Sequence, residues 1–173
     1  NDELYGLPDP TKPGWLDAYA NYCKYIAQYF GDRVNHYEIW NEWNHSSMGK
    51  TDPNRRGGNY YAMALVAASK AIKSVNPNAK IIGGAMAGHN EGWMVDMLSY
   101  DGNNDGKSDA MEAMDGFSFH AYNTDWVSCF YRPAEQGYYS GYDEVIAVLN
   151  RYGDASTKEI WMTETGWSTA IGP

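Results

Sequence analysis

The chain has 173 residues, a formal net charge of -9 and a hydrophobic content of 43%, which suits one globular domain with a single core. The acidic balance, with no cluster of Lys or Arg, argues against nucleic acid and anionic membranes as partners. A membrane span is not predicted, because the sequence has no run of about 18 apolar residues. We therefore expect a neutral ligand. The 15 tyrosines and seven tryptophans suit stacking on sugar rings, although aromatic residues also fill cores.

Helices and strands alternate along the predicted chain. Residues 1–14 contain three prolines and predict a loop. The predicted helices span 15–30, 60–75, 91–100 and 142–152, and the predicted strands span 34–40, 80–85, 116–122 and 159–163. Long loops at 44–58 and 123–141 are typical of segments that shape a binding site. The connections are too long for hairpins, which predicts parallel strands with crossover helices.

An α/β barrel is preferred to a doubly wound sheet because no glycine-rich phosphate loop follows a predicted strand. Instead, the apolar stretches at 37–44 and 159–167 each deliver a glutamate near the end of a strand, Glu42 and Glu164. Barrel enzymes keep their chemistry at the carboxyl ends of their strands. Two glutamates presented in this way are the minimum set for cleaving a glycosidic bond.

Residues 40–42 (Trp-Asn-Glu) and 163–167 (Thr-Glu-Thr-Gly-Trp) resemble the two catalytic signatures of clan A, the superfamily of retaining (β/α)8-barrel glycoside hydrolases. The resemblance implies that Glu42 is the acid/base at the end of barrel strand four and Glu164 the nucleophile at the end of strand seven. It also implies that Asn41 bonds the sugar 2-hydroxyl. Two strands are predicted between the signatures, as between strands four and seven. Residues 164–168 are similar to β-1,3-glucanases and residues 40–44 to xylosidases and cellulases, so the sugar stays open.

The predicted strand 116–122 occupies the sixth-strand position of this superfamily, where a His or Tyr often lies near the nucleophile. His120 and Tyr122 point to the same face by alternation, and we expect His120 to donate to Glu164. The alternative is that His120 is a framework residue. The aromatic residues Trp43, Trp126 and Trp167 complete the predicted substrate-binding set.

Residues 101–112 match the twelve-residue calcium loop of EF-hands, with a glycine at the sixth position and a glutamate at the twelfth. The predicted calcium ligands are Asp101, Asn103, Asp105, the Lys107 carbonyl, Asp109 and Glu112. The alternative interpretation is a solvated acidic turn that only reverses the chain.

Together these features predict one catalytic segment, 1–173, of a secreted retaining hydrolase that acts on a β-linked oligo- or polysaccharide, in the manner of a cellulase, β-glucanase or xylanase. The alternative is a non-catalytic carbohydrate-binding or scaffold protein with a barrel-derived fold. No signal peptide is visible at Asn1, so we interpret the chain as a mature or excised form. Cys23 and Cys129 lack metal-ligand spacing; we expect free thiols, and the alternative is that they pair in an oxidising compartment.

Four strands make half of an eight-stranded barrel, which typically takes about 250 residues. By the superfamily's numbering the chain would hold strands four to seven. An open parallel sheet has two unpaired edges and an uncovered inner face. We expect a homodimer in which four plus four strands close a barrel, and the competing explanation is a fragment of a longer gene product.

Overall fold

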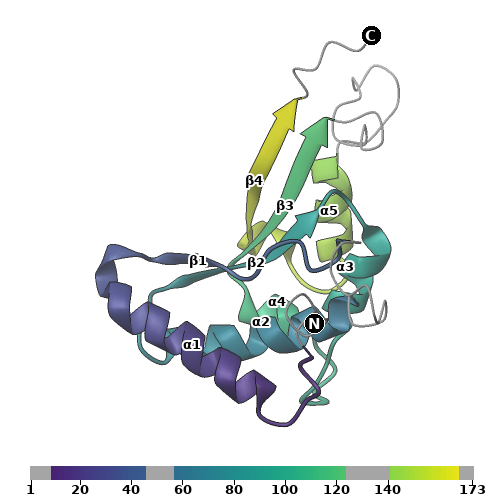
Figure 1. Ribbon diagram of the computed structural model, residues 1–173. Helices are drawn as coiled ribbons and strands as arrows, with labels where there is room; N and C mark the ends of the chain where they lie inside the picture. Colours follow the sequence, from purple (N-terminus) through teal and green to yellow (C-terminus); the bar gives the residue numbers. More distant parts are fainter. Residues whose placement is uncertain (1–8, 46–56, 124–140, 168–173) are drawn as a thin grey trace, which may run out of the picture.

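The computed structural model describes residues 9–45, 57–123 and 141–167 (Figure 1). The strands are β1 (His36–Glu38), β2 (Lys80–Ala87), β3 (Gly116–Asn123) and β4 (Glu159–Trp167). The helices are α1 (Trp15–Phe30), α2 (Gly58–Lys73), α3 (Glu91–Leu98), α4 (Asp109–Ala113) and α5 (Gly141–Leu149), with short 3-10 helices η2 (Gly31–Arg33) and η6 (Ala155–Thr157). All pairs in the sheet are parallel, in the order β1-β2-β3-β4. This confirms the predicted half of a TIM-type α/β barrel.

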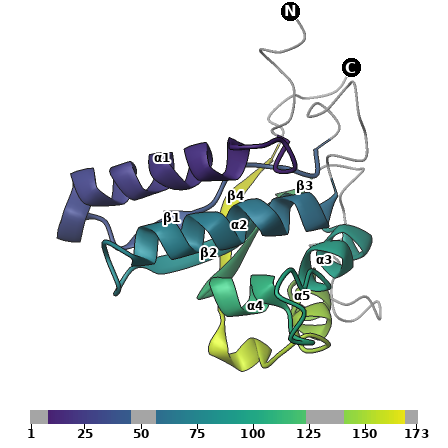
Figure 2. The same ribbon diagram turned by 90° about the horizontal axis from the view of Figure 1, so that it is seen from below.

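The sheet curls, and the helices lie along its outer side. In Figure 1, α1 and α2 run along β1 and β2, while α3 and α5 lie beside β3; Figure 2 shows α1 next to α2. On the other face, the Thr163 hydroxyl of β4 donates to Glu38 Oε1 of β1 at 2.7 Å. A flat sheet would hold these edge strands about 14 Å apart. The contact therefore requires strong curvature, as in a barrel wall.

The core lies between the sheet and α2, which packs against both α1 and α3. Tyr61, Leu65, Ala68 and Ile72 of α2 are buried, and their spacing of three and four residues places them on one helix face. The largest fully buried side chains of the described residues are Trp43, Tyr61, Phe117, Leu65, Ile72, Ile81, Met86, Met94, Met97, Leu98, Met114 and Leu149. No described helix combines the length and apolar character needed to cross a membrane.

A bulge in β2 is held by two buried side chains. The register with β3 shifts between Gly83 and Met86, and Gly84 adopts a φ of 103°, which suits glycine. The Gly84 amide donates to the Tyr61 hydroxyl at 2.8 Å, and that hydroxyl donates to the Ile39 carbonyl after β1 at 2.9 Å. The Ala85 amide donates to Ser118 Oγ at 2.8 Å. Burial raises the pKa of Tyr61, so its hydroxyl stays protonated and able to donate.

Three local predictions differ from the structure. β1 covers three residues and not 34–40, because Trp40 and Glu42 take positive φ values of 68° and 47° that turn the chain out of the extended conformation. β4 continues past residue 163 to Trp167. Helix α4 was not predicted; it begins inside the acidic loop, where Ser108 Oγ accepts from the Met111 amide at 3.2 Å and caps the first turn.

Tyr61→Phe should destabilise the fold, since it leaves the Gly84 amide and the Ile39 carbonyl without their buried partner. A buried unsatisfied group costs about 1–3 kcal/mol, and we expect a matching loss of unfolding free energy in urea. Tyr25→Phe, at an exposed position on α1, is the control and should change little. Equal unfolding midpoints for the two variants would contradict the bridging role of Tyr61.

Candidate active site

The turn after β1 positions Glu42. Its amide donates to the Ala85 carbonyl in the β2 bulge at 2.7 Å. Next to it, Asn44 forms a paired contact with the end of β2, accepting from the Ala87 amide at 2.8 Å and donating to the Ala87 carbonyl at 2.9 Å. The turn is thereby fastened to the neighbouring strand at two points, which fixes where the Glu42 carboxylate lies.

A second bulge positions Glu164 in β4. Phe119 pairs with Met162, but His120 pairs with Glu164, so Thr163 is one extra residue on β4. Bulges re-aim the side chains that follow them and are common beside active sites. Here the extra residue puts Glu164 opposite His120, at the same end of the sheet as Glu42.

The two glutamates meet at His120. His120 Nδ1 lies 2.9 Å from Glu42 Oε1 and 3.6 Å from Glu164 Oε2. The histidine side chain is 1% exposed, whereas those of Glu42 and Glu164 are 25% and 39% exposed. Ligand atoms of the three residues all lie within 4.8 Å of one another. A buried imidazole thus holds two solvent-accessible carboxylates side by side.

Two of the residues predicted to bind substrate do not present a surface to it. Trp43 is fully buried, and its ring contacts Trp40 and Tyr61 at centroid distances of 5.2 and 5.8 Å. It is a core residue, because its position in the tight turn directs the ring toward α2. His120 is also buried, and its hydrogen bond goes to Glu42 and not, as predicted, to Glu164. His120 therefore contacts the two carboxylates from inside the sheet.

The other predicted sugar contacts stay predictions. Asn41 is exposed directly beside Glu42, at the carboxyl end of β1. Tyr122 lies in β3 and Trp167 in β4, but their side chains are outside the described part of the structure. Trp126 lies outside the described residues altogether.

Sequence reasoning missed the residues that support the pair. Nothing in the alternation of residues 159–167 reveals a bulge at Thr163, and the Asn44 contact with β2 joins positions 43 residues apart. The signal available in the sequence was the group of Asn and Glu residues that follows a β-branched and aromatic run. It located the turn after β1 but did not reveal the β2 residues that the turn contacts.

The predicted calcium loop lies elsewhere, between α3 and β3. Its side chains accept hydrogen bonds from its own backbone: Asp101 from the amides of Asp105 and Gly106 at 3.0 and 2.8 Å, and Asp109 from Gly102 at 2.9 Å. The Glu112 carboxylate faces Lys107 Nζ at 3.5 Å. Within the described part of the chain, the only group of three or more acidic, His or Cys side chains gathered within 4.8 Å is the one at His120. Calcium binding by the loop stays a prediction.

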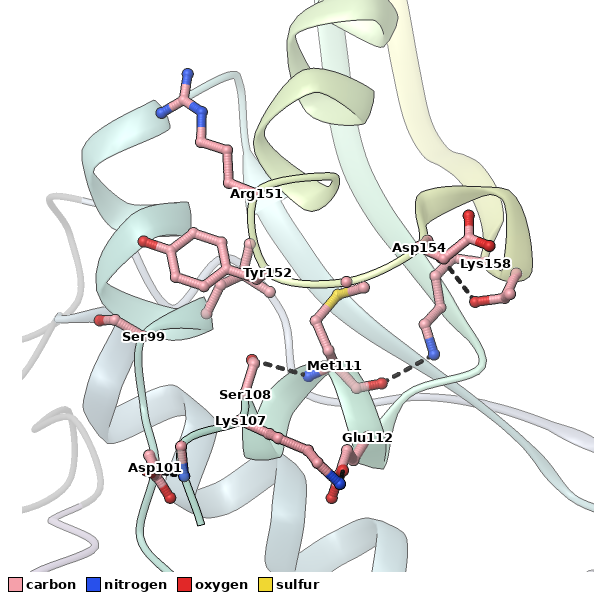
Figure 3. A pocket seen from close by; sticks show the side chains of 14 residues that line it. Ser99, Asp101, Lys107, Ser108, Met111, Glu112, Arg151, Tyr152, Asp154 and Lys158 are labelled. Atoms are coloured by element: carbon pink, nitrogen blue, oxygen red, sulfur yellow. Dashed lines mark hydrogen bonds and ion pairs between the residues drawn. The ribbon is translucent and has the colours of Figure 1, made fainter. Parts of the chain in front are cut away.

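A hollow of about 610 Å³ adjoins this loop, and Figure 3 shows Asp101 and Glu112 on one side of it and Arg151 and Lys158 on the other. Lys158 Nζ donates at 2.8 Å to the carbonyl of Met111 in α4, a favourable place for a cation near a helix C-terminus. Burial lowers the pKa of Lys158. The hollow lies where β3 and β4 begin, at the opposite end of the strands from Glu42 and Glu164, so it is separate from the candidate active site.

Cys23 lies buried on α1, and burial raises the pKa of its thiol. Cys129 lies outside the described residues, so the structure does not test whether the two cysteines pair.

No curated protein sequence matches the chain, but several solved structures share its fold. A family 39 β-xylosidase from Caulobacter crescentus has 19% identity and a TM-score of 0.58, over 98% of this chain and 32% of that one. A family 39 glycoside hydrolase from Bacteroides cellulosilyticus has 23% identity and a TM-score of 0.59, over 94% and 32%. An α-L-arabinofuranosidase from Thermotoga maritima has 16% identity and a TM-score of 0.57, over 94% and 34%.

At these identities the solved structures show a shared fold, and the chain spans about a third of the length of each of them. The model of the family described as "Glycosyl hydrolases family 39" matches residues 17–170, nearly the whole sequence. This match confirms the resemblance to the retaining barrel glycosidases of clan A and the interpretation of the chain as a segment of such a barrel. The chain belongs to glycosyl hydrolases family 39.

Proposed function

We propose that this chain carries the catalytic pair of a retaining glycoside hydrolase acting on a β-linked glycan. The observation that carries the proposal is the approach of Glu42 and Glu164, each of which has a carboxylate oxygen within 4.8 Å of an oxygen of the other, beside His120. Retaining glycosidases hold their carboxyl groups about 5–5.5 Å apart, and inverting ones about 6.5–9.5 Å to admit a water. The short separation therefore favours double displacement.

In this mechanism Glu164 attacks the anomeric carbon while Glu42 protonates the departing glycosidic oxygen. A covalent glycosyl-enzyme forms, and Glu42 then takes a proton from the water that hydrolyses it. His120 holds Glu42 through the 2.9 Å contact of Nδ1 with Oε1. Asn41, exposed beside Glu42, would bond the hydroxyl next to the reacting carbon.

The choice of sugar is a finer part of the proposal. One similar structure is that of a β-xylosidase and another that of an α-L-arabinofuranosidase, which makes pentosides the first substrates to test. Aryl β-xylosides, aryl α-arabinofuranosides and a panel of β-glucan, xylan, mannan and galactan would separate pentosidase from glucanase activity. Retention should appear by NMR as an initial product with the anomeric configuration of the substrate. An inverted product would overturn double displacement.

The rival function is a non-catalytic carbohydrate-binding or scaffold protein that keeps the barrel wall. Such a protein would bind glycans without releasing reducing sugar from any member of the substrate panel. The paired carboxylates favour the enzyme, because a binding surface has no need of two adjacent acids held by a buried imidazole.

Glu164→Gln should abolish labelling by a 2-fluoro sugar, since an amide cannot serve as the nucleophile. Glu42→Gln should lower kcat by about 10²–10⁴-fold, the range for a general acid/base. Its activity should recover in part on aryl glycosides with acidic phenols, which need no protonation to leave. Intact-protein mass spectrometry measures the labelling and steady-state kinetics the rates.

Glu159→Gln is the matched control: it changes an exposed glutamate at the other end of the same strand and should leave kinetics and labelling unchanged. Persistent labelling of Glu164→Gln would show that another residue is the nucleophile.

Calcium in the loop at 101–112 is a separate prediction, made from the sequence. An ion that binds only the folded state raises its stability, so EDTA should lower the melting temperature and calcium should restore it. Asp101→Ala should remove the response to calcium, while Asp17→Ala on α1 should keep it. If EDTA leaves the melting temperature unchanged in the parent protein, the loop is the solvated turn of the alternative interpretation.

The partner that completes the barrel is also a proposal. In the described sheet β1 and β4 each pair with one strand, the β4 side chain Met162 is exposed, and a groove of about 350 Å³ separates α1 from β1. Two copies related by a two-fold axis would supply eight strands. The remaining strands of a longer chain would do the same, as the length of the solved relatives suggests.

Light scattering distinguishes these two sources of strands. If the dimer closes the barrel, the 173-residue chain should have twice its monomer mass, and Met162→Asp on the open edge should lower that mass to the monomer value. A soluble monomer of the parent chain would contradict the dimer.

We also propose that the protein is secreted, as suits a hydrolase of polysaccharides.

A further inference from the structure

We propose that Glu42, His120 and Glu164 form a binding site for a divalent transition-metal ion such as Zn²⁺, which would occupy the space between the two glutamates and block the candidate active site. Within the described residues this is the only group of three or more such side chains with ligand atoms inside 4.8 Å of one another. It combines one imidazole nitrogen with two carboxylates. The proposal goes beyond glycoside hydrolysis, and metal binding can be measured without any substrate.

The two distances from His120 fit a tetrahedral zinc ion. Zinc binds nitrogen at about 2.0–2.1 Å and carboxylate oxygen at about 2.0–2.2 Å, so two of its ligand atoms lie about 3.4 Å apart. His120 Nδ1 lies 2.9 Å from Glu42 Oε1 and 3.6 Å from Glu164 Oε2, which brackets that value. The ligand oxygens of Glu42 and Glu164 lie within 4.8 Å of each other, and an ion between them would draw the two carboxylates toward the separation of about 3.4 Å set by zinc geometry.

The ligand types favour a transition metal over calcium or magnesium. Imidazole is a good ligand for zinc and copper, whereas hard cations prefer six or more oxygens. The ion would take the place of the hydrogen between His120 Nδ1 and Glu42 Oε1.

The site is both fixed and accessible. His120 is buried in β3, and Glu42 lies in a turn that is fastened to β2, so little ordering is needed on binding. The Glu42 and Glu164 carboxylates are partly exposed, which gives an ion access and leaves a position for water. An ion held there would separate Glu164 from a sugar and take the oxygen of Glu42 that must carry the catalytic proton.

The test is a titration of the purified, tag-free protein with ZnCl₂, followed by calorimetry and by thermal unfolding. We expect saturable binding of one ion and a rise in melting temperature, because the ion binds the folded state. MgCl₂ at the same concentrations should give no such binding in the presence of saturating calcium. Absence of zinc binding would overturn the proposal.

Two variants locate the ion. His120→Ala and Glu164→Gln should each weaken zinc binding by more than about tenfold, since even the loss of an outer hydrogen-bond partner of a metal ligand costs about that much. His89→Ala is the matched control: His89 Nδ1 lies 3.0 Å from Glu144 Oε2, a histidine–glutamate pair outside the gathered group. Its zinc affinity should equal that of the parent. Glu164 is partly exposed, so Glu164→Gln remains informative if His120→Ala fails to fold.

Unchanged zinc affinity in Glu164→Gln would place the ion elsewhere and overturn the proposal. If the protein hydrolyses aryl glycosides, zinc should also inhibit competitively, raising KM without lowering kcat. That arm rests on the proposed function, whereas the calorimetry does not. Zinc binding with no hydrolysis of any substrate would therefore support the metal site and count against the enzyme.

Discussion

The Tyr61 hydroxyl joins the three elements on which the site depends. It lies on α2, donates to Ile39 at the end of β1 and accepts from Gly84 in the bulge of β2. Both backbone groups are at points where a strand departs from regular geometry, and neither lies near water. Without this hydroxyl the turn that carries Glu42 and the bulge that supports it would each have an unpaired polar group in the core. The geometry of the acid therefore depends on a residue that does not touch it.

Much of the fold follows from periodicity in the sequence. The spacing of Tyr61, Leu65, Ala68 and Ile72 predicts α2, and four apolar runs separated by helices predict the parallel sheet. The two glutamates could be located because each follows a β-branched or aromatic run and the two stretches are correctly spaced, with His120 between them. These are local signals, readable within a few residues, and they were sufficient to place Glu42 and Glu164 at one end of the sheet.

The failures came from contacts between residues distant in sequence. The local sequence of an aromatic residue next to an acid is the same whether its ring faces a sugar or the core. Here the positive φ values at Trp40 and Glu42 turn the chain so that Trp43 is buried. Which glutamate bonds His120 depends on the register of the strands that carry the two glutamates relative to β3. The periodicity of the sequence does not reveal that register. Helix α4 is five residues long, too short for a periodic signal, and its cap lies within a loop with a stronger pattern of its own.

Thr163 divides β4 into two parts, and the register with β3 differs by one residue between them. The alternation that runs from Glu159 through Trp161 stops at Thr163, which bonds Glu38, and begins again at Glu164 opposite His120. Loss of Thr163 alone would leave Met162 opposite Phe119 and Glu164 opposite His120, so the acid would keep its partner and its face of the sheet. The strand would instead lose the hydroxyl that reaches across to Glu38, so the extra residue serves the curvature of the sheet beside the acid.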